Sequence, residues 1–177
     1  MEGLDTSKIN YEIAKEFIAQ IIYRLDESTR MVTTSFDQLE EGDIWKRYNE
    51  SSNTIGNLML HLCGNITQYA IASLDNKEDK RERDKEFEAT AGVSKEALLV
   101  KLKDTVEEAK KILVNCSVSE LMRKREVQGF ILSGIGIAIH VTEHYSYHTG
   151  QIAFWTKQLK DKDLGFYNGM NLNAKNE

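Results

Sequence analysis

Two segments of this chain are nearly free of charged side chains, although acidic and basic residues make up 29% of the whole sequence. Ser51 to Leu74 contains no charged residue, and Val127 to Thr156 contains only Glu143. A segment of this length without charge is typical of a protein interior, because burying an unpaired charge is costly. We therefore expect these two segments to form the centre of the fold, surrounded by the charged remainder.

Apolar residues recur at three- and four-residue steps along four parts of the chain, which is the spacing of one face of an α-helix. The pattern predicts helices over about 7–39, from Ser52 or Asn53 to about 74, from a cap at Ser94 to about 113, and over about 133–159. The chain contains no proline, which favours long uninterrupted helices. We expect an all-α protein, a four-helix bundle.

The connections between these helices are expected to be simple. Residues 126–132 predict a short extended segment, and the mixed-charge run 77–88 predicts a solvated connection. Residues 1–177 are expected to form a single domain, with a core over about 7–160 and a flexible tail over 161–177.

Charge and polarity argue against two classes of partner. The 28 acidic and 23 basic residues give a net charge of −5, whereas nucleic-acid binding needs a concentrated basic face. The two uncharged segments contain histidines and amides that would be costly in lipid, so we expect no membrane partner. The polar start, Met1 to Lys8, shows no signal-peptide pattern. Cys63 and Cys116 form no disulfide framework, and we expect a cytoplasmic protein.

All four histidines lie in the two low-charge segments. His140, His144 and His148 fall at i, i+4 and i+8, on one face of the last helix, and His61 lies in the second helix. Two histidines one turn apart are separated by about 6 Å along the axis and can share an ion, whereas the outer pair is about 12 Å apart. We predict a transition-metal site, zinc or nickel, with His61 as a third ligand and either His140 or His148 redundant.

The second helix carries a stripe of polar but uncharged residues. Asn57, His61, Asn65 and Gln68 follow one another at three- or four-residue steps. A stripe that faces solvent would normally include lysine or glutamate, so we expect this one to face an internal polar cavity. Asn65, one turn beyond His61, is expected to contact the substrate or a water beside the metal.

A competing motif overlaps the histidines of the last helix. His140 to His144 matches H-x-x-E-H, the inverted metalloprotease motif. The motif is short and weakly specific, and the sequence offers no strand pattern for aligning a peptide substrate. Few residues follow His144, and the acidic ones among them lie near the tail. The protease interpretation is therefore disfavoured.

A longer signature resembles a known family. The segment from His144 to Gln151, HYSYHTGQ, resembles the H-x-x-x-H-x-G-Q signature of the DinB/YfiT-like metalloenzymes. Ser52 to His61 resembles the first histidine helix of the same family, and the likeness extends from the first helix to about Leu159.

This resemblance implies that His61, His144 and His148 are the three ligands of a divalent ion and that His140 lies outside the set. Gly150 is then expected to permit close helix approach. Gln151 is expected to hydrogen-bond near the site.

The resemblance also implies two chemistries, thiol (S-) transfer and hydrolysis, on a small-molecule substrate. A low-molecular-weight thiol and a second copy of the chain, in a homodimer, are the expected partners. Tyr145 and Tyr147 are expected to make core or dimer contacts. The alternative is a non-catalytic bundle in which a metal or the buried histidines only stabilise the fold.

Overall fold

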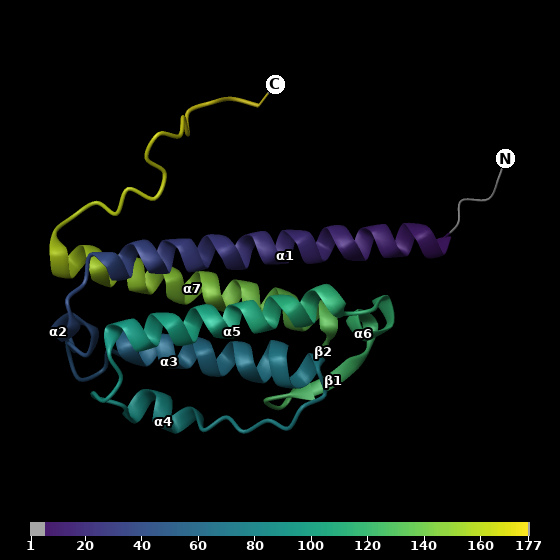
Figure 1. The fold of residues 1–177 in the computed structure, drawn as a ribbon, viewed down its shortest axis with the longest axis horizontal. Helices are drawn as coiled ribbons and strands as arrows, with labels where there is room; N and C mark the ends of the chain where they lie inside the picture. The colour runs from purple at the N-terminus through teal and green to yellow at the C-terminus, as the bar shows by residue number, and fades with distance from the viewer. Residues whose placement is uncertain (1–5, 177) are drawn as a thin grey trace.

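Four long helices form the body of the computed structural model, which describes residues 6–176 (Figure 1). They are α1 (Thr6–Asp37), α3 (Ile55–Ile66), which the π-helix η1 (Thr67–Ala72) continues, α5 (Lys95–Asn115) and α7 (Gly134–Lys160). The shorter elements are α2 (Glu41–Ile44), α4 (Arg83–Glu88), α6 (Val118–Met122), β1 (Lys124–Val127) and β2 (Phe130–Ser133). The expected all-α four-helix bundle is confirmed. Residues 1–5, in the polar start, and Glu177, at the end of the expected tail, lie outside the described residues.

The long helices pack in a ring. α1 contacts α5 and α7, and α3 contacts the same two helices from the opposite side (Figure 1). The interior is filled by apolar side chains from all four helices, among them Leu25, Phe36, Met59, Leu62, Leu102, Ile137 and Tyr145. Tyr145 is thus a core residue, whereas Tyr147 is exposed. The low-charge segment 51–74 supplies the largely buried α3 and η1, whereas the segment 127–156 supplies α7, which buries one face and exposes the other.

Polar caps set the starts of three helices. Ser94 and Ser133 accept hydrogen bonds from backbone amides in the first turns of α5 and α7, as expected from the sequence. α3 begins later than expected, after Thr54 rather than at Ser52 or Asn53. The Thr54 hydroxyl accepts a hydrogen bond from the backbone N–H of Asn57. In return, the side-chain oxygen of Asn57 accepts one from the backbone N–H of Thr54. This reciprocal capping box satisfies two backbone donors at once.

The predicted extended segment is a β-hairpin. β1 and β2 pair antiparallel, with Val127 opposite Phe130. Gln128 and Gly129 form its two-residue turn, both with positive φ (53° and 81°), as such tight hairpin turns require. The Tyr69 hydroxyl donates to the Gln128 side chain at 2.9 Å, which ties the hairpin to η1.

The mixed-charge run is not simply a solvated connection. Residues 77–89, here called the α4 strap, run along the outside of α3 (Figure 1). The side chains of Arg81 and Glu86 are only 4% and 10% exposed. Most of this run is exposed, as predicted, but the prediction missed Arg81 and Glu86 because it treated all the charges alike, whereas a buried pair of opposite charges can satisfy itself.

Three residues of the polar stripe, Asn57, His61 and Gln68, contact this strap, whereas Asn65 contacts His140 on α7. Asn57 donates to the backbone carbonyls of Glu86 and Ala89 at 2.9 and 2.7 Å. Gln68 donates to the Asp79 carboxylate at 2.6 Å. Uncharged amides suit this position because they satisfy backbone groups of the strap without introducing a buried charge.

The end of the chain lies outside the bundle. Residues 161–176 contain turns and, within the described range, neither helix nor strand. Leu164 is buried, and Arg30 donates to the Phe166 carbonyl at 3.1 Å, whereas residues 167–176 are exposed. Among the described residues, no helix is both long and apolar enough to cross a membrane.

Candidate metal centre

Three histidines from two helices meet between α3 and α7. His61, His144 and His148 each offer a ring nitrogen within 4.8 Å of the other two. The Nε2 atoms of His61 and His144 lie 2.9 Å apart. In a tetrahedral zinc site, bonds of 2.0–2.1 Å place two ligand nitrogens about 3.3 Å apart. Small side-chain adjustments would therefore let these three nitrogens share one ion.

The partner of His61 determines which of its nitrogens faces the site. Nδ1 of His61 lies 3.0 Å from Oε2 of Glu86. Burial opposes ionisation of Glu86, but hydrogen bonds from Arg81 and His61 outweigh it and lower the pKa of this carboxyl. Nη2 of Arg81, which can only donate, also lies 3.1 Å from Nδ1, but it donates to Oε2 of Glu86 at 2.8 Å. An ionised carboxylate can only accept, so the closer contact with Glu86 favours the proton on Nδ1 of His61. Nε2 is left with a free lone pair for a metal.

His148 is oriented in the same way by a different group. Its Nδ1 lies 2.7 Å from Oε1 of Gln151. The amide nitrogen of Gln151 donates to the Tyr147 hydroxyl at 3.1 Å, which fixes the amide oxygen toward His148. Nδ1 of His148 is therefore the donor, and Nε2 again keeps its lone pair. The expectation that Gln151 hydrogen-bonds near the site agrees with this contact.

His144 and His148 favour the neutral imidazole. Burial, followed by the neighbouring His148 and His61, lowers the pKa of His144 to about 3. Burial also lowers the pKa of His148, although the hydrogen bond with Gln151 opposes the shift. Metal binding requires unprotonated imidazole, so these rings need no deprotonation at neutral pH.

Arg81 and Glu86 are functional candidates that the sequence analysis missed. Arg81 donates to both oxygens of Glu86, from Nε at 2.7 Å and from Nη2 at 2.8 Å, and from Nη1 to Gln68 at 2.9 Å. A Cβ at Gly64 would lie 1.9 Å from Oε1 of Glu86. Glycine at this position therefore lets the pair lie against α3 without displacement. The sequence held one sign of this contact: Gly64 lies inside an uncharged helix that is followed by the mixed-charge run.

His140 lies outside the cluster. Its Nε2 is 3.2 Å from Nδ2 of Asn65, and its ring stacks on Tyr69 at a centroid distance of 4.0 Å. Because the Asn65 amide nitrogen only donates, Nε2 of His140 accepts and its lone pair is occupied. Asn65 therefore contacts the fourth histidine, and the structure does not place it against the three clustered rings.

Gly150 departs from its expected role. A Cβ at this position would meet nothing within 4 Å, and the residue is exposed. It therefore does not serve close helix approach. The residue instead borders a surface hollow that Gln151 also lines.

Fold and cluster together define a helical-bundle protein with a three-histidine centre. The chain belongs to the family described as "Protein of unknown function (DUF1572)", whose model matches residues 12–168. The crystal structure of a DinB-like protein, YjoA, from Bacillus subtilis is similar, with a TM-score of 0.64 and 18% sequence identity. The match covers 84% of this chain and 96% of that one, and at this identity it concerns the fold. A comparison with curated proteins found no match.

Proposed function

We propose that this protein is a metal-dependent enzyme in which His61, His144 and His148 hold one divalent ion, zinc or nickel. The observation that carries the proposal is the convergence of these rings, two of them with Nδ1 engaged by a partner residue. A ring whose Nδ1 is engaged presents Nε2 to a metal, which is the usual arrangement of histidine ligands. The family resemblance and the fold support the same assignment.

His61, His144 and His148 would hold the ion through their imidazoles. A metal held in this way lowers the pKa of a bound water or thiol and polarises a carbonyl group. We propose thiol transfer or hydrolysis on a small molecule, with a low-molecular-weight thiol as the candidate co-substrate. In this scheme, Glu86 and Arg81 hold His61 in place, and Gln151 holds His148.

The competing function is a non-catalytic bundle with structural histidines. One observation favours it: His61 and His144 are within hydrogen-bonding distance of each other, and Glu86 and Gln151 complete a network that a metal is not needed to close. The two functions differ in what they require. A structural network requires only the rings, whereas an enzyme requires stoichiometric metal and turnover.

Metal analysis of protein purified without a histidine tag tests the first requirement. We expect about one zinc or nickel ion per chain, by mass spectrometry of acid-digested protein. His61→Ala, His144→Ala and His148→Ala should each lose the ion, because three ligands leave little redundancy. His140→Ala is the matched control and should retain it, because Asn65 and Tyr69 already engage that ring.

Two results would contradict the proposal. Metal retained in full by any of the first three variants would remove that residue from the ligand set. Loss of metal in His140→Ala with retention in His148→Ala would move the site one turn toward the start of α7. A screen of the loaded wild type for thiol transfer and ester or amide hydrolysis, with His144→Ala as the blank, then separates the enzyme from the structural bundle.

A further inference from the structure

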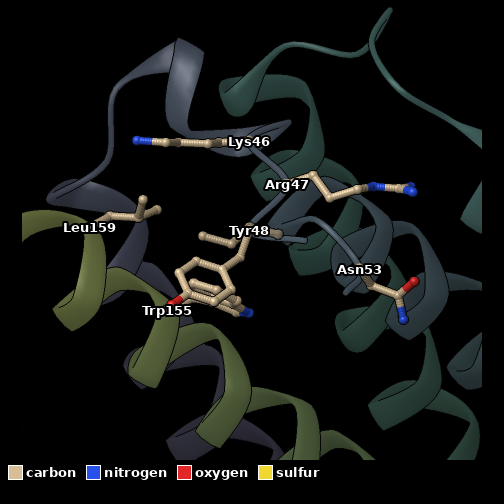
Figure 2. Close-up of a pocket in the computed structure, with 7 residues that line it drawn as sticks. Lys46, Arg47, Tyr48, Asn53, Trp155 and Leu159 are labelled. Carbon is tan, nitrogen blue, oxygen red and sulfur yellow. The ribbon is translucent and has the colours of Figure 1, made fainter. Parts of the chain in front are cut away.

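Two adjoining hollows lie on the surface where the loop after α2 meets α7. The smaller, about 150 Å³, is lined by Lys46, Arg47, Tyr48, Asn53, Ile55, Trp155 and Leu159 (Figure 2). The larger, about 480 Å³, is lined by Ser51, Ser52, Asn53, Leu58, Tyr147, Gly150, Gln151, Phe154 and Trp155. Asn53 and Trp155 border both hollows, which therefore adjoin each other and are together called the groove here. Its size suits a small molecule.

Aromatic side chains make up much of the wall of this groove. Tyr48 and Trp155 lie beside each other, with ring centroids 5.1 Å apart (Figure 2). Phe154 and Tyr147 extend the aromatic surface along α7, and both are exposed, as is Tyr48. Exposed aromatic rings gathered at one hollow are typical of a binding site, because they offer a large apolar area at low cost in conformational entropy.

The charge along the groove has one sign. Lys46 and Arg47 are both exposed and extend from the loop in opposite directions, toward the Leu159 side and the Asn53 side (Figure 2). Of the described residues that line the two hollows, none is acidic. The other polar lining groups are hydroxyls and amides, which can hydrogen-bond a ligand of either charge. Such a rim favours an anionic group on the ligand over a neutral one.

We propose that this groove binds a small molecule with a planar apolar body and an anionic group such as a carboxylate. The body lies against Trp155 and Tyr48, and the anion lies at the Lys46–Arg47 rim. Gln151 borders the groove and also holds His148, so the groove adjoins the histidine cluster. The inference stands on the lining residues and is independent of whether a metal binds.

Tryptophan fluorescence offers a direct test. The chain has two tryptophans, and Trp45 lies outside the groove with its indole donating to the Val93 carbonyl. Trp45→Phe therefore makes Trp155 the single reporter. Phenylacetate and its uncharged analogue phenylacetamide are titrated into this variant, with and without chelator. We expect saturable fluorescence changes with phenylacetate at concentrations on the order of millimolar, at least about fivefold weaker binding of phenylacetamide, and no effect of the chelator.

Substitutions in the same background separate the two parts of the proposal. Lys46→Gln with Arg47→Gln should weaken phenylacetate binding about fivefold and leave phenylacetamide unchanged. Tyr48→Ala should weaken both ligands. The matched control, Lys103→Gln with Lys111→Gln on exposed positions of α5, should change neither.

Three outcomes would overturn the inference. One is equal affinity for the acid and the amide, which removes the anionic preference. Another is an equal loss of phenylacetate binding in the α5 control, which would show only a general charge effect. The third is the absence of a saturable response to either compound.

Discussion

Glu86 joins the strap to the histidine cluster, and its side chain touches both His61 and Arg81. Glu86→Gln keeps the size of the side chain but removes the charge that holds the proton on Nδ1 of His61. We expect about a 10–100-fold loss of zinc affinity, the usual effect of removing a partner of a metal ligand. Competition with a chromophoric chelator measures it. The exposed Glu82→Gln is the control and should bind as the wild type does.

Truncation of the same residue should affect the fold as well as the site. Glu86→Ala leaves the guanidinium of Arg81, only 4% exposed, without its anion. Breaking a buried ion pair from one side lowers the free energy of unfolding by about 3–5 kcal/mol. Urea unfolding of metal-free protein at pH 7.5 measures the change. A loss below about 1 kcal/mol would show that solvent reaches Arg81 and that the pair is not a buried one.

The buried histidines predict instability in acid. Burial lowers the pKa of His144 from 6.5 to about 3, and it lowers those of His140 and His148 in the same direction. Below about pH 6.5, these histidines therefore bind more protons in the unfolded chain than in the folded chain. The free energy of unfolding is therefore undiminished above about pH 6.5 and falls as the pH drops toward the pKa values of these histidines in the folded chain.

We accordingly expect the free energy of unfolding of metal-free protein to fall from pH 7 to pH 5, with an uptake of about one proton or more on unfolding. Urea titrations at several pH values measure the slope of the unfolding free energy against pH. His144→Gln should flatten it, because the glutamine does not titrate. A slope unchanged by this substitution would assign the acid sensitivity to other groups.

At the scale of elements, the strap and α3 can approach each other because Gly64 has no side chain. Gly64→Ala would favour the helix intrinsically, but its Cβ would overlap the Glu86 carboxylate. We expect a net loss of about 1–3 kcal/mol in unfolding free energy, as for other overpacked sites, together with weaker zinc binding.

Gly136→Ala on α7 is the matched control for this prediction. Its Cβ would make only ordinary contacts, the nearest at 3.6 Å, so the substitution should stabilise the protein by about 0.5–1 kcal/mol. Similar gains in both variants would mean that Glu86 and Arg81 move aside freely. The crystal structure of Gly64→Ala would then show the pair displaced from His61.

At the scale of the whole molecule, the N-terminal part of α1 and the neighbouring α6 carry an apolar surface. Ile13 and Met122 are each 63% exposed, and they line a hollow of about 330 Å³ together with Phe17, Val118, Leu121 and Ile135. We propose that a second copy of the chain covers this surface through a two-fold interface, the commonest arrangement of homodimers. Burial of these side chains would then stabilise the pair.

Sedimentation equilibrium tests this proposal. The wild type should show a concentration-dependent dimer, and Ile13→Lys with Met122→Lys should sediment as a monomer with an unchanged helical circular dichroism spectrum. Val100→Lys, at an exposed apolar position on α5, is the control and should still dimerise. A wild type that is monomeric at high concentration, or a dimer that survives the double substitution, would contradict the proposal.

Local patterns in the sequence determined the helices and much of the cluster. Helix periodicity depends on neighbours three and four residues apart, so the stripes of α1, α5 and α7 could be recognised without a structure. The same spacing placed His144 and His148 on adjacent turns of one face. The absence of charge correctly indicated that α3 is buried, whereas α7 buries only one of its faces.

Tertiary structure decided the rest, because it depends on contacts between residues distant in sequence. Spacing alone treated His140 and His148 as equals; the structure separates them through the contacts of His140 with Asn65 and Tyr69 and of His148 with Gln151. Likewise, two charges in an apparently solvated run lie buried on α3, because the path of the strap brings Arg81 and Glu86 to His61. The sequence by itself determined which long helices form and which apolar faces they bury, since both follow from interactions within a few turns. Only the packing of those helices and the strap determined the partners of each histidine, since that choice depends on side chains that meet only in the folded chain.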